Sequence, residues 1–489
     1  MQFPILSVII FLPLIAGVII LLLPETRKAE VRAVALAAAS VTFVLCVWAY
    51  FSYNIAAGGY QLIEHAAWLP ALGISYYLGI DGISAPLLLL GGIVLLCGVL
   101  ISWNVEDRPR EFFAFLMFLG TSVLGVFCSL DLFELFFFFE IAVFPKYLMI
   151  AVWGSPKTRE YGSMKLTLYL FIGSVVSLVG ALAMYFAAGL HTFDMLALEK
   201  AGFPLAFQLA WFPVVFLGFA ILGGIFPFHS WAPDGHVAAP TAISMLLAGV
   251  EMKVGAFAAL RVAIMLLPAG VHYWAPWILA LGTVNVVYGA AIAMVQKDFK
   301  YVIGFSSVSH MGLVLIGFAT LNPTGLMGAG MQMFSHGIMT ACFFAVVGMV
   351  YDRAHTRDIS SLGGLFKKMP WAATAFIIAG LVSMGMPGFS GFAAEFLIFM
   401  GAWQSEPWVA LVAVLGVIIT AAYIFRLIGR VFFGEIPAAL EHVGDVGVLD
   451  KIAVTLLAAL MVALGLFPSL MVPMIQSGVN HVMQLLGGA

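Results

Sequence analysis

Several ionisable residues stand inside long apolar stretches of this sequence. Lys253 lies in MLLAGVEMKVGAFAAL, and Glu140 follows the run LFFFF. His310, His336 and Glu395 have similar surroundings, in VSHMGLVLIG, FSHGIM and GFAAEFLIF. An ionisable side chain in a lipid-soluble segment is costly and marks a route for ions or protons by default. These five residues are therefore predicted to form a polar file that carries protons across the protein.

Two further charges need an explanation of their own. Six residues of ideal helix rotate by about 240°, so Glu140 and Lys146 do not share a face unless Pro145 bends the helix. Lys146 stands toward the inner side of its span and could simply reach the inner membrane surface. Glu251 stands about 200° from Lys253 and cannot pair with it along one face. It is expected to meet another helix or a neighbouring subunit, or to form a local ion pair.

Simpler interpretations remain open for the other residues. Glu140 could be a neutral, hydrogen-bonded acid, and each histidine could be a satisfied core residue. Two histidines on adjacent predicted helices, each beside a serine, favour a proton relay. A metal site is disfavoured because no third ligand has suitable spacing.

The composition indicates a membrane protein. Of 489 residues, 63% are hydrophobic and only 9% are charged, which is far from the balance of a soluble domain. The net charge of −3 gives no reason to expect nucleic-acid binding. The four cysteines form no CxxC or metal spacing and are expected to be buried; they are Cys46, Cys97, Cys128 and Cys342. No dinucleotide or Walker motif appears, so no nucleotide, haem or iron–sulfur centre is expected in this chain.

Runs of roughly 20 apolar residues predict about 14 transmembrane helices, an all-α membrane fold. Phe3–Leu23 is too long for a signal-peptide core and lacks a basic region before it. The predicted spans are 3–23, 33–53, 81–102, 111–129, 132–152, 163–188, 211–228, 240–266, 274–295, 300–320, 325–351, 371–403, 408–433 and 452–475.

Helices 7 and 12 are predicted to be broken, at Pro227 and within GMPGFSG (385–391). Breaks five spans apart predict two five-helix repeats, and an odd number makes them inverted, as in many transporters. The chain is expected to form a single transmembrane domain over residues 1–489. It divides into helices 1–3 (1–110), a first repeat (111–266), a second repeat (274–433), and helix 14 with the tail (434–489). The outer segments 54–80 and 189–210 are expected to act as lids.

The positive residues predict the orientation. With both termini outside, inner loops and helix ends hold seventeen of the 21 Lys and Arg, and only Lys200 lies in an outer loop. The seventeen are Arg27, Lys28, Arg32, Arg108, Arg110, Lys157, Arg159, Lys165, Lys297, Lys300, Arg353, Arg357, Lys367, Lys368, Arg426, Arg430 and Lys451.

Four motifs resemble a known family: PFHSWAPDGHVAAPTAISMLLAGVEMK, GFSSVSHMGLVLIG, FSHGIMTACFFAVVGMVYDRAHTRDI and GMPGFSGFAAEF. They are similar to the antiporter-like subunits of respiratory complex I and of Mrp sodium/proton antiporters, and most similar to the M type of NADH:quinone oxidoreductase. The resemblance covers most of the chain. It implies a fourteen-helix bundle with two inverted repeats, in agreement with the span count.

The resemblance also implies roles for residues. Glu140 resembles the family's helix-five glutamate, Lys253 its helix-eight lysine, and His310 and His336 its connecting histidines. Glu395 occupies the helix-twelve position, where glutamate favours the M type over the L, N and Mrp D types. One departure is serious: Leu222 stands where the family usually has a helix-seven lysine. We hypothesise that Lys146 supplies the missing ammonium.

The resemblance implies a proton-translocating subunit in the inner membrane of a bacterial cell. Its partners would be other membrane-arm subunits, including L-type and N-type subunits, together with lipid, water and protons. FMN and iron–sulfur clusters would belong to partner subunits, with no cofactor in this chain. Alternatives are a D-type Mrp antiporter subunit, a structural subunit that has lost transport, and a hydrogenase-type or ferredoxin-driven relative.

Overall fold

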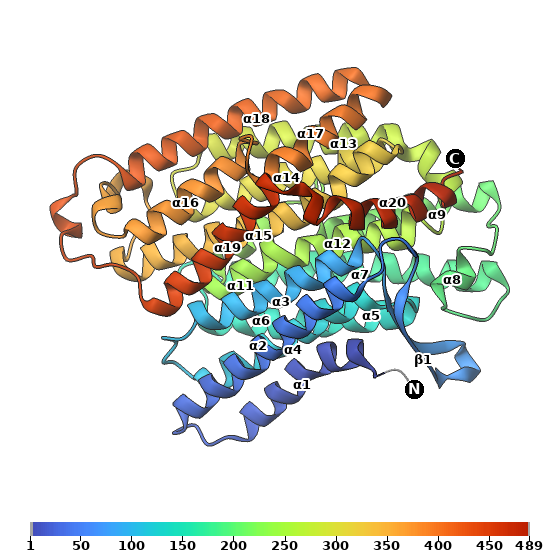
Figure 1. The fold of residues 1–489 in the computed structure, drawn as a ribbon, viewed down its shortest axis with the longest axis horizontal. Coiled ribbons are helices and arrows are strands. Elements are labelled where there is room, and N and C mark those ends of the chain that lie inside the picture. The colour runs from blue at the N-terminus through green and yellow to red at the C-terminus, as the bar shows by residue number, and fades with distance from the viewer. Residues whose placement is uncertain (1–2, 488–489) are drawn as a thin grey trace.

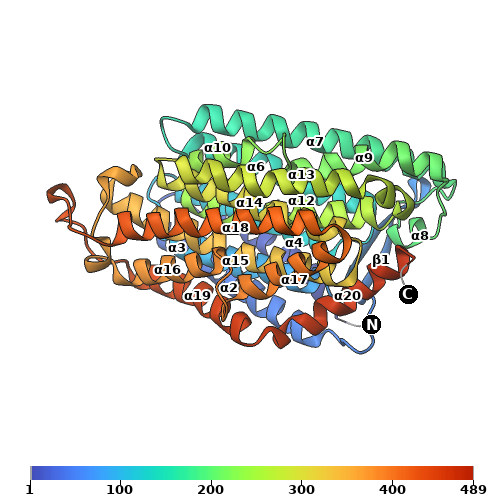
Figure 2. The ribbon, with the colours of Figure 1, turned by 90° about the horizontal axis from the view of Figure 1, so that it is seen from above.

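Long apolar helices run side by side along the longest axis of the computed structural model, which describes residues 3–487 (Figures 1 and 2). Thirteen of the described helices are long and apolar enough to cross a membrane. A further span is divided into two shorter helices, Pro370–Ser383 and Ser390–Ser405. The fourteen predicted spans are therefore confirmed, and the chain is a multi-pass membrane protein.

The first half of the chain contains nine spanning or linking helices and the only two strands among residues 3–487. They are α1 (Ile5–Leu22), α2 (Lys28–Ser52), β1 (Gln61–Leu69), β2 (Ile74–Ile80), α3 (Ser84–Ile101), α4 (Pro109–Cys128), α5 (Leu132–Ile141), α6 (Val143–Trp153), α7 (Arg159–Ala188), α8 (Met195–Leu198), and α9 (Leu205–Leu222).

The remaining elements begin at the first break. They are α10 (Trp231–Ala238), α11 (Thr241–Leu246), the π-helical η2 (Leu247–Glu251), α12 (Met252–Ala258), the π-helical η3 (Ala259–Ile264), α13 (Pro268–Val295), α14 (Phe299–Ala319), α15 (Pro323–Ala354), α16 (Pro370–Ser383), α17 (Ser390–Ser405), α18 (Pro407–Leu427), the π-helical η6 (Ile428–Phe432), α19 (Val448–Leu466) and α20 (Val472–Leu485). Short 3₁₀ turns occupy Pro70–Leu72, Ile359–Ser361, Leu365–Lys367, Ala438–Leu440 and Pro468–Leu470.

Both predicted breaks are present. The first separates α9 from α11, with α10 lying between them, and the second separates α16 from α17 at residues 384–389. Before the first break, α9 ends at Leu222, six residues earlier than the predicted end of that span at residue 228. A third, smaller interruption lies at Ala142, between α5 and α6, where Pro145 was expected to be able to bend the helix. It precedes Pro145, whose ring clashes with the carbonyl of Ile141 in a continuous helix.

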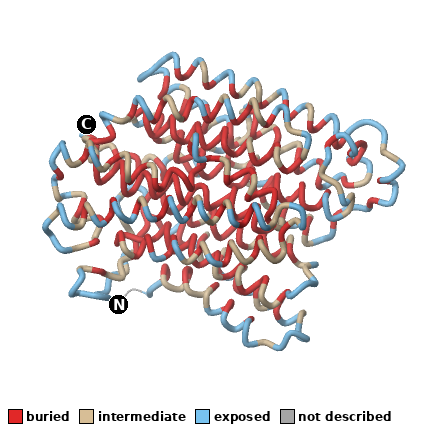
Figure 3. Tube along the Cα trace, turned by 180° about the vertical axis from the view of Figure 1, so that it is seen from behind, coloured by how far each residue is buried: buried red, intermediate tan, exposed pale blue. Residues whose placement is uncertain are grey.

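The helices that carry the ionisable residues lie in the centre. Buried residues gather in the middle of the bundle, and exposed ones lie on the outer helices (Figure 3). Thr241–Ile264 and Pro323–Ala354 are buried throughout their most apolar stretches, whereas α2, α7 and α18 are not. The outer helices therefore shield the central ones from lipid, so that polar groups can be placed there.

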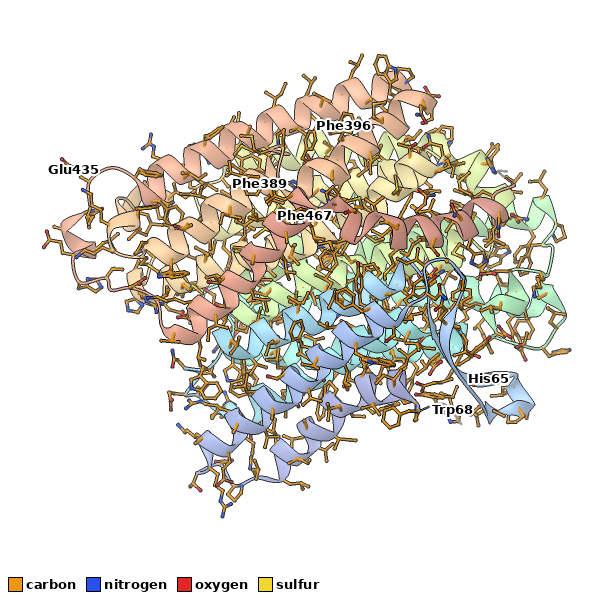
Figure 4. All side chains as sticks on the ribbon, viewed as in Figure 1. His65, Trp68, Phe389, Phe396, Glu435 and Phe467 are labelled. Carbon is orange, nitrogen blue, oxygen red and sulfur yellow. The ribbon has the colours of Figure 1, made fainter. Side chains whose placement is uncertain are left out.

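The two ends of the bundle differ in character. Figure 4 shows Glu435, in the loop after η6, at one end, and His65 and Trp68 of β1 at the other. We call the first the basic end, because the loops there carry most of the Lys and Arg residues. We call the second the hairpin end, where α1 begins and α20 ends (Figure 1).

The predicted lid at 54–80 contains an antiparallel hairpin of β1 and β2, which the all-α prediction did not include. Gly73 closes its turn with φ at +68°, a conformation that favours glycine. A Cβ at Gly73 would lie only 1.8 Å from the carbonyl oxygen of His191. The hairpin is therefore packed against the second predicted lid, 189–210, through a contact that only glycine permits.

The last predicted span, 452–475, is shorter than expected. α19 ends at Leu466, Pro468 begins a 3₁₀ turn, and α20 continues as a separate helix. A Cβ at Gly465 would lie 2.2 Å from the Cα of Phe389, so α19 passes very close to the break before α17. Figure 4 labels Phe389 at that break and Phe467 at the end of α19.

Asp131 connects the hairpin to α5. Its side chain accepts hydrogen bonds from the backbone N–H groups of Phe133 (2.9 Å) and Glu134 (3.2 Å), and from Ser75 of β2 (2.9 Å). Burial raises the pKa of Asp131 to about 6, against the effect of these three donors. The residue is an N-cap that also fixes the hairpin above the membrane helices.

We predict that Asp131→Ala lowers the stability of the protein by about 1–2 kcal/mol, because the cap acceptors are lost. Asp131→Asn retains an oxygen for the helix N-terminus and should lose much less. Thermal unfolding in detergent measures both variants. Equal destabilisation by Ala and Asn would contradict the capping role.

Candidate functional site: a file of buried ionisable groups

Lys253 lies on the most irregular helix of the bundle. Two π-helical stretches, η2 and η3, flank the short α12 on which it stands. Single-turn π segments are rare and occur frequently at functional sites. Lys253 is fully buried, and its ammonium donates to the carbonyl of Ala248 within η2. Among residues 3–487 it forms no ion pair with a carboxylate, so its charge is balanced only by dipoles and by groups that approach it.

Lys146 and Glu251 form an ion pair inside the membrane region. Their Nζ and Oε2 atoms are 2.5 Å apart, and the two side chains are only 3% and 2% exposed. Glu251 therefore meets another helix, as expected, and Lys146 does not reach the surface. The second carboxylate oxygen of Glu251 is buried and has no hydrogen-bond partner in the described part of the chain.

Helical rotation explains how Lys146 reaches this position. Ala142 keeps right-handed helical dihedrals between α5 and α6, so Leu132–Trp153 crosses the bundle as one span. The expected difference in facing is confirmed: Glu140 is exposed on its helix and Lys146 is buried. Glu140 shares its exposed face with Phe137 and Phe144, which lie three residues before it and four after it.

Glu140 is therefore the one predicted residue that the structure does not bring into the file. It forms no hydrogen bond or ion pair with any residue between 3 and 487. The helical period places it on the outside of the bundle, so this chain supplies neither the enclosed surroundings of the predicted proton carrier nor the hydrogen-bond partner of the simpler interpretation. Leu222, where the family usually has lysine, is buried and offers no cation.

His310, His336 and Glu395 form a cluster at the second break. The rings of His310 and His336 stack, with centroids 5.3 Å apart and an interplanar angle of 13°. His310 Nε2 lies 3.5 Å from Glu395 Oε1, with both side chains 3% exposed. The expected proximity of these three groups is confirmed.

Both nitrogens of His310 face backbone carbonyls. Nδ1 lies 2.9 Å from Ser306 O, and Nε2 lies 3.0 Å from Ser383 O. A neutral imidazole has one N–H, so only the protonated ring can donate to both carbonyls. Glu395 would supply the counter-charge. His336 differs, because neither of its ring nitrogens has a partner in the described chain.

The break between α16 and α17 makes room for the Glu395 carboxylate. Gly385 has φ at +64°, and a Cβ there would lie 2.7 Å from Glu395 Oε2. Ser383 ends α16 and presents its carbonyl to His310. The glycine-rich motif therefore both breaks the helix and leaves space for the Glu395 carboxylate at the break.

Sequence reasoning missed most of the polar residues around this cluster. Tyr423 donates to Ser306 Oγ at 2.7 Å, and Ser390 lies 2.7 Å from Ser335, the serine that had been noted beside His336. Gln332, one turn before His336, is buried with an unpartnered oxygen. Its position four residues from His336 was a usable signal, because i and i+4 share a helix face.

Lys253 connects the two halves of the bundle. The backbone before it packs on the helix that carries His336: a Cβ at Gly249 would lie 3.1 Å from the carbonyl oxygen of Gly337. Glu251, the partner of Lys146, is two residues from Lys253 in the chain and about 200° from it around the helix. The order is therefore Lys146–Glu251, Lys253, His336, His310 and Glu395, which accounts for five of the six predicted site residues.

A separate ion pair lies at the hairpin end. Arg261 Nη2 is 2.5 Å from Asp81 Oδ1, and Arg261 also donates to Tyr60 at 2.9 Å. Although burial opposes ionisation, the Arg261 guanidinium holds the pKa of Asp81 below its usual value. This pair fixes the end of η3 to the segment before α3, and it is fully compensated, unlike Lys253.

No group of three or more His, Cys, Asp or Glu side chains between residues 3 and 487 is arranged to hold a metal ion. The four cysteines are buried and unpaired, as expected. The chemistry that the arrangement supports is proton transfer between neighbouring side chains and water.

Comparisons with known proteins agree with this geometry. Residues 129–420 match the family described as NADH:quinone oxidoreductase/Mrp antiporter, TM. The NAD(P)H-quinone oxidoreductase chain 4 of Gloeobacter violaceus is 38% identical over 96% of this chain and 90% of its own length. The NADH-quinone oxidoreductase subunit M of Rhodobacter capsulatus is 37% identical over 98% and 96%.

Solved structures have the same fold. A chain of respiratory complex I from Thermus thermophilus with bound NADH superimposes with a TM-score of 0.91 and 29% identity, covering 99% of this chain and 100% of that chain. A chain of the Mrp complex from Dietzia has a TM-score of 0.88 at 20% identity, covering 100% of both, which shows the fold alone. The chain belongs to the family of NADH:quinone oxidoreductase and Mrp antiporter transmembrane subunits.

Proposed function

We propose that this chain is the M-type antiporter-like subunit of a proton-translocating NADH:quinone oxidoreductase. The observation that carries the proposal is the continuous series of buried ionisable groups between the two broken helices, with Lys253 at its centre. Quinone reduction in partner subunits supplies the energy. The chain moves protons by changing which of these groups holds the charge.

The cluster at the second break supports a transfer mechanism. His310 offers two N–H donors when protonated, and Glu395 lies 3.5 Å from one of them. His336 stacks on His310 and keeps both nitrogens free to accept or release a proton. A proton that leaves Lys253 can therefore pass to His336, His310 and Glu395 in turn. At each stage the charge stays on a protein side chain and does not enter lipid.

Lys146 and Glu251 regulate Lys253 in this proposal. While they are paired, their opposite charges largely cancel, so the pair has little electrostatic effect on Lys253. When the pair opens, the Glu251 carboxylate, two residues away, favours the protonated form of Lys253. The pair supplies from α6 and η2 the cation and acid that the family usually places at helices five and seven.

Glu140 is assigned to contact with a neighbour. A carboxylate near the middle of a membrane span needs a polar partner, and this chain offers none among residues 3–487. We propose that the face with Phe137, Glu140 and Phe144 packs against another membrane-arm subunit of the L or N type. That subunit would provide the cation or hydrogen-bond donor.

The redox centres belong elsewhere in the assembly in this proposal. The chain contributes translocation, while partner subunits hold FMN and the iron–sulfur clusters. The basic end faces the inner side of a bacterial cell membrane, and both termini face the outer side, in accordance with the positive-inside rule.

A D-type Mrp antiporter subunit is the second candidate, supported by the shared fold. Relatives that are 36–38% identical are quinone oxidoreductase subunits, which favours the first proposal. A transport-deficient structural subunit is the third, and it is supported only by Leu222. The buried Lys146–Glu251 pair argues against it, because a purely structural helix contact is as stable with apolar residues.

We predict that Lys253→Met lowers NADH-driven proton translocation by about tenfold or more, since the central carrier is lost. The complex, purified through a tag on this chain and placed in liposomes, gives the proton-to-electron ratio. Lys200→Met, which alters an exposed lysine in an outer loop, is the control. An unchanged ratio for Lys253→Met would establish the structural alternative. Transport that requires Na⁺ and no NADH would establish the Mrp alternative.

The Lys146–Glu251 pair gives a second prediction. Lys146→Met or Glu251→Gln alone leaves one buried charge without compensation and should destabilise the protein by about 3–5 kcal/mol. The double variant Lys146→Met/Glu251→Gln should recover most of that loss, yet translocate protons poorly. Thermal unfolding in detergent and proton translocation are measured on all three. Additive destabilisation would show that the pair does not exist in the membrane.

A further inference from the structure

A pocket at the basic end is lined by three cations and a single acid. It has a volume of about 380 Å³ and lies between the end of α13, the 3₁₀ turn at Ile359–Ser361 and the end of α18. The cations are Lys297, Arg426 and Arg430, and none of them forms an ion pair with a carboxylate within residues 3–487. Three cations against one carboxylate leave an excess of two positive charges in the pocket.

The acid in the lining, Asp358, is already occupied by its own turn. One of its oxygens accepts the backbone N–H of Ser360 at 3.2 Å. The other accepts the hydroxyl groups of Ser360 at 2.6 Å and of Ser361 at 3.1 Å. The carboxylate therefore caps the turn and does not serve as the counter-ion of the arginines.

The two arginines are held close together without an anion between them. They stand four residues apart, Arg426 on α18 and Arg430 on the π-helical η6, and like charges at this spacing destabilise a helix. Arg426 donates from Nη2 to the carbonyl of Gln296 at 3.0 Å. Its Nε is buried and has no acceptor in the described part of the chain. A buried guanidinium N–H without an acceptor is costly, so the pocket lacks an anion with several oxygens.

The arginines continue a face of α18 that is directed to lipid. Leu411, Leu415 and Ile418 are 53–60% exposed, and Ala422 is exposed as well. Each is three or four residues from the next, and Arg426 follows Ala422 at the same spacing, so all five lie along one side of the helix. α18 forms one edge of the bundle (Figure 1). The pocket is therefore at the boundary between the apolar surface of the protein and the polar layer of the membrane.

We propose that this pocket binds the phosphodiester headgroup of an anionic phospholipid, with the acyl chains lying along the exposed face of α18. Val295, which is 65% exposed at the end of α13, gives the chains a second apolar contact beside the pocket. Guanidinium groups suit phosphate because their planar N–H groups can bind two oxygens at once. Basic pockets between transmembrane helices are a known way to hold such headgroups. The inference goes beyond proton translocation and does not depend on it.

A purely structural role for the arginines is the competing explanation. Arg426 binds the last turn of α13, and Arg430 stands near the C-terminus of its own helix, where a cation is favourable. Cations at this end also set the orientation of the chain. In that case water solvates the two side chains, and lysine serves as well as arginine. A built headgroup site requires both the charge and the guanidinium geometry.

The first experiment locates the lipid on the assembled complex, purified through a tag on this chain. The complex is placed in phosphatidylcholine vesicles that contain phosphatidylglycerol with a diazirine in one acyl chain, or phosphatidylcholine with the same chain. After illumination, peptides from α13 and α18 should carry the anionic lipid at least about fivefold more than the neutral one. Arg426→Gln/Arg430→Gln should remove this preference. The matched control is Lys157→Gln/Lys367→Gln, which removes two exposed lysines from other loops at the basic end.

The second experiment keeps the charge and changes only the geometry. Arg426→Lys/Arg430→Lys preserves the orientation signal, yet it should lose about half of the preference or more, because an ammonium cannot form paired bonds. A wild-type preference in this variant, or equal labelling by both lipids in the unchanged protein, would overturn the proposal. Displacement of the lipid by inorganic phosphate at constant ionic strength would assign the pocket to a free anion instead. Labelling of a partner subunit in place of α18 would assign it to an acidic protein segment.

Discussion

A charge buried in a helix bundle must find its compensation inside the protein, because lipid offers none. The cost of an uncompensated charge in a low-dielectric interior is large, and even a well-made ion pair recovers only part of it. Arg261 with Asp81 and Lys146 with Glu251 meet this constraint by close pairing. Lys253 does not, since its ammonium has only the Ala248 carbonyl. The rest of the arrangement follows from that incomplete compensation.

The irregular backbone is placed where compensation is needed. The π segments around α12 and the break between α16 and α17 each expose carbonyls or admit a side chain. Ala248 serves Lys253, Ser383 serves His310, and Gly385 leaves space for Glu395. A regular helix satisfies its own carbonyls and has none to offer. Broken helices therefore provide the polar environment that a fully regular bundle lacks.

The same constraint applies at the boundaries of the subunit, where buried charges meet water or a neighbouring protein. At the basic end, the buried Lys300 and the first break at Ala239 and Pro240 line a cavity of about 270 Å³. On the lateral surface, Glu140 faces outward with two phenylalanines and has no partner in the described chain. At the first boundary water can compensate the charge, and at the second a neighbouring protein must do so. A subunit of this kind is electrostatically complete only within its assembly.

The sequence by itself determined the number of spans, the two main breaks and five of the six ionisable residues predicted for the site. Span length, glycine, proline and apolar context are local properties, and each is visible in a window of about 20 residues. Periodicity even separated Glu140 from Lys146, which the exposed and buried positions confirm. It also indicated that Glu251 would meet another helix.

Only the tertiary structure decided which charges meet. Lys146 and Glu251 are 105 residues apart in the chain, and they meet only because α6 packs near η2. Gln332, Tyr423 and Ser306 became part of the site only because helices distant in sequence lie together. The hairpin and the early end of α19 were likewise set by close backbone contacts at Gly73 and Gly465. Long-range packing fixes these features, and no local pattern in the sequence encodes it.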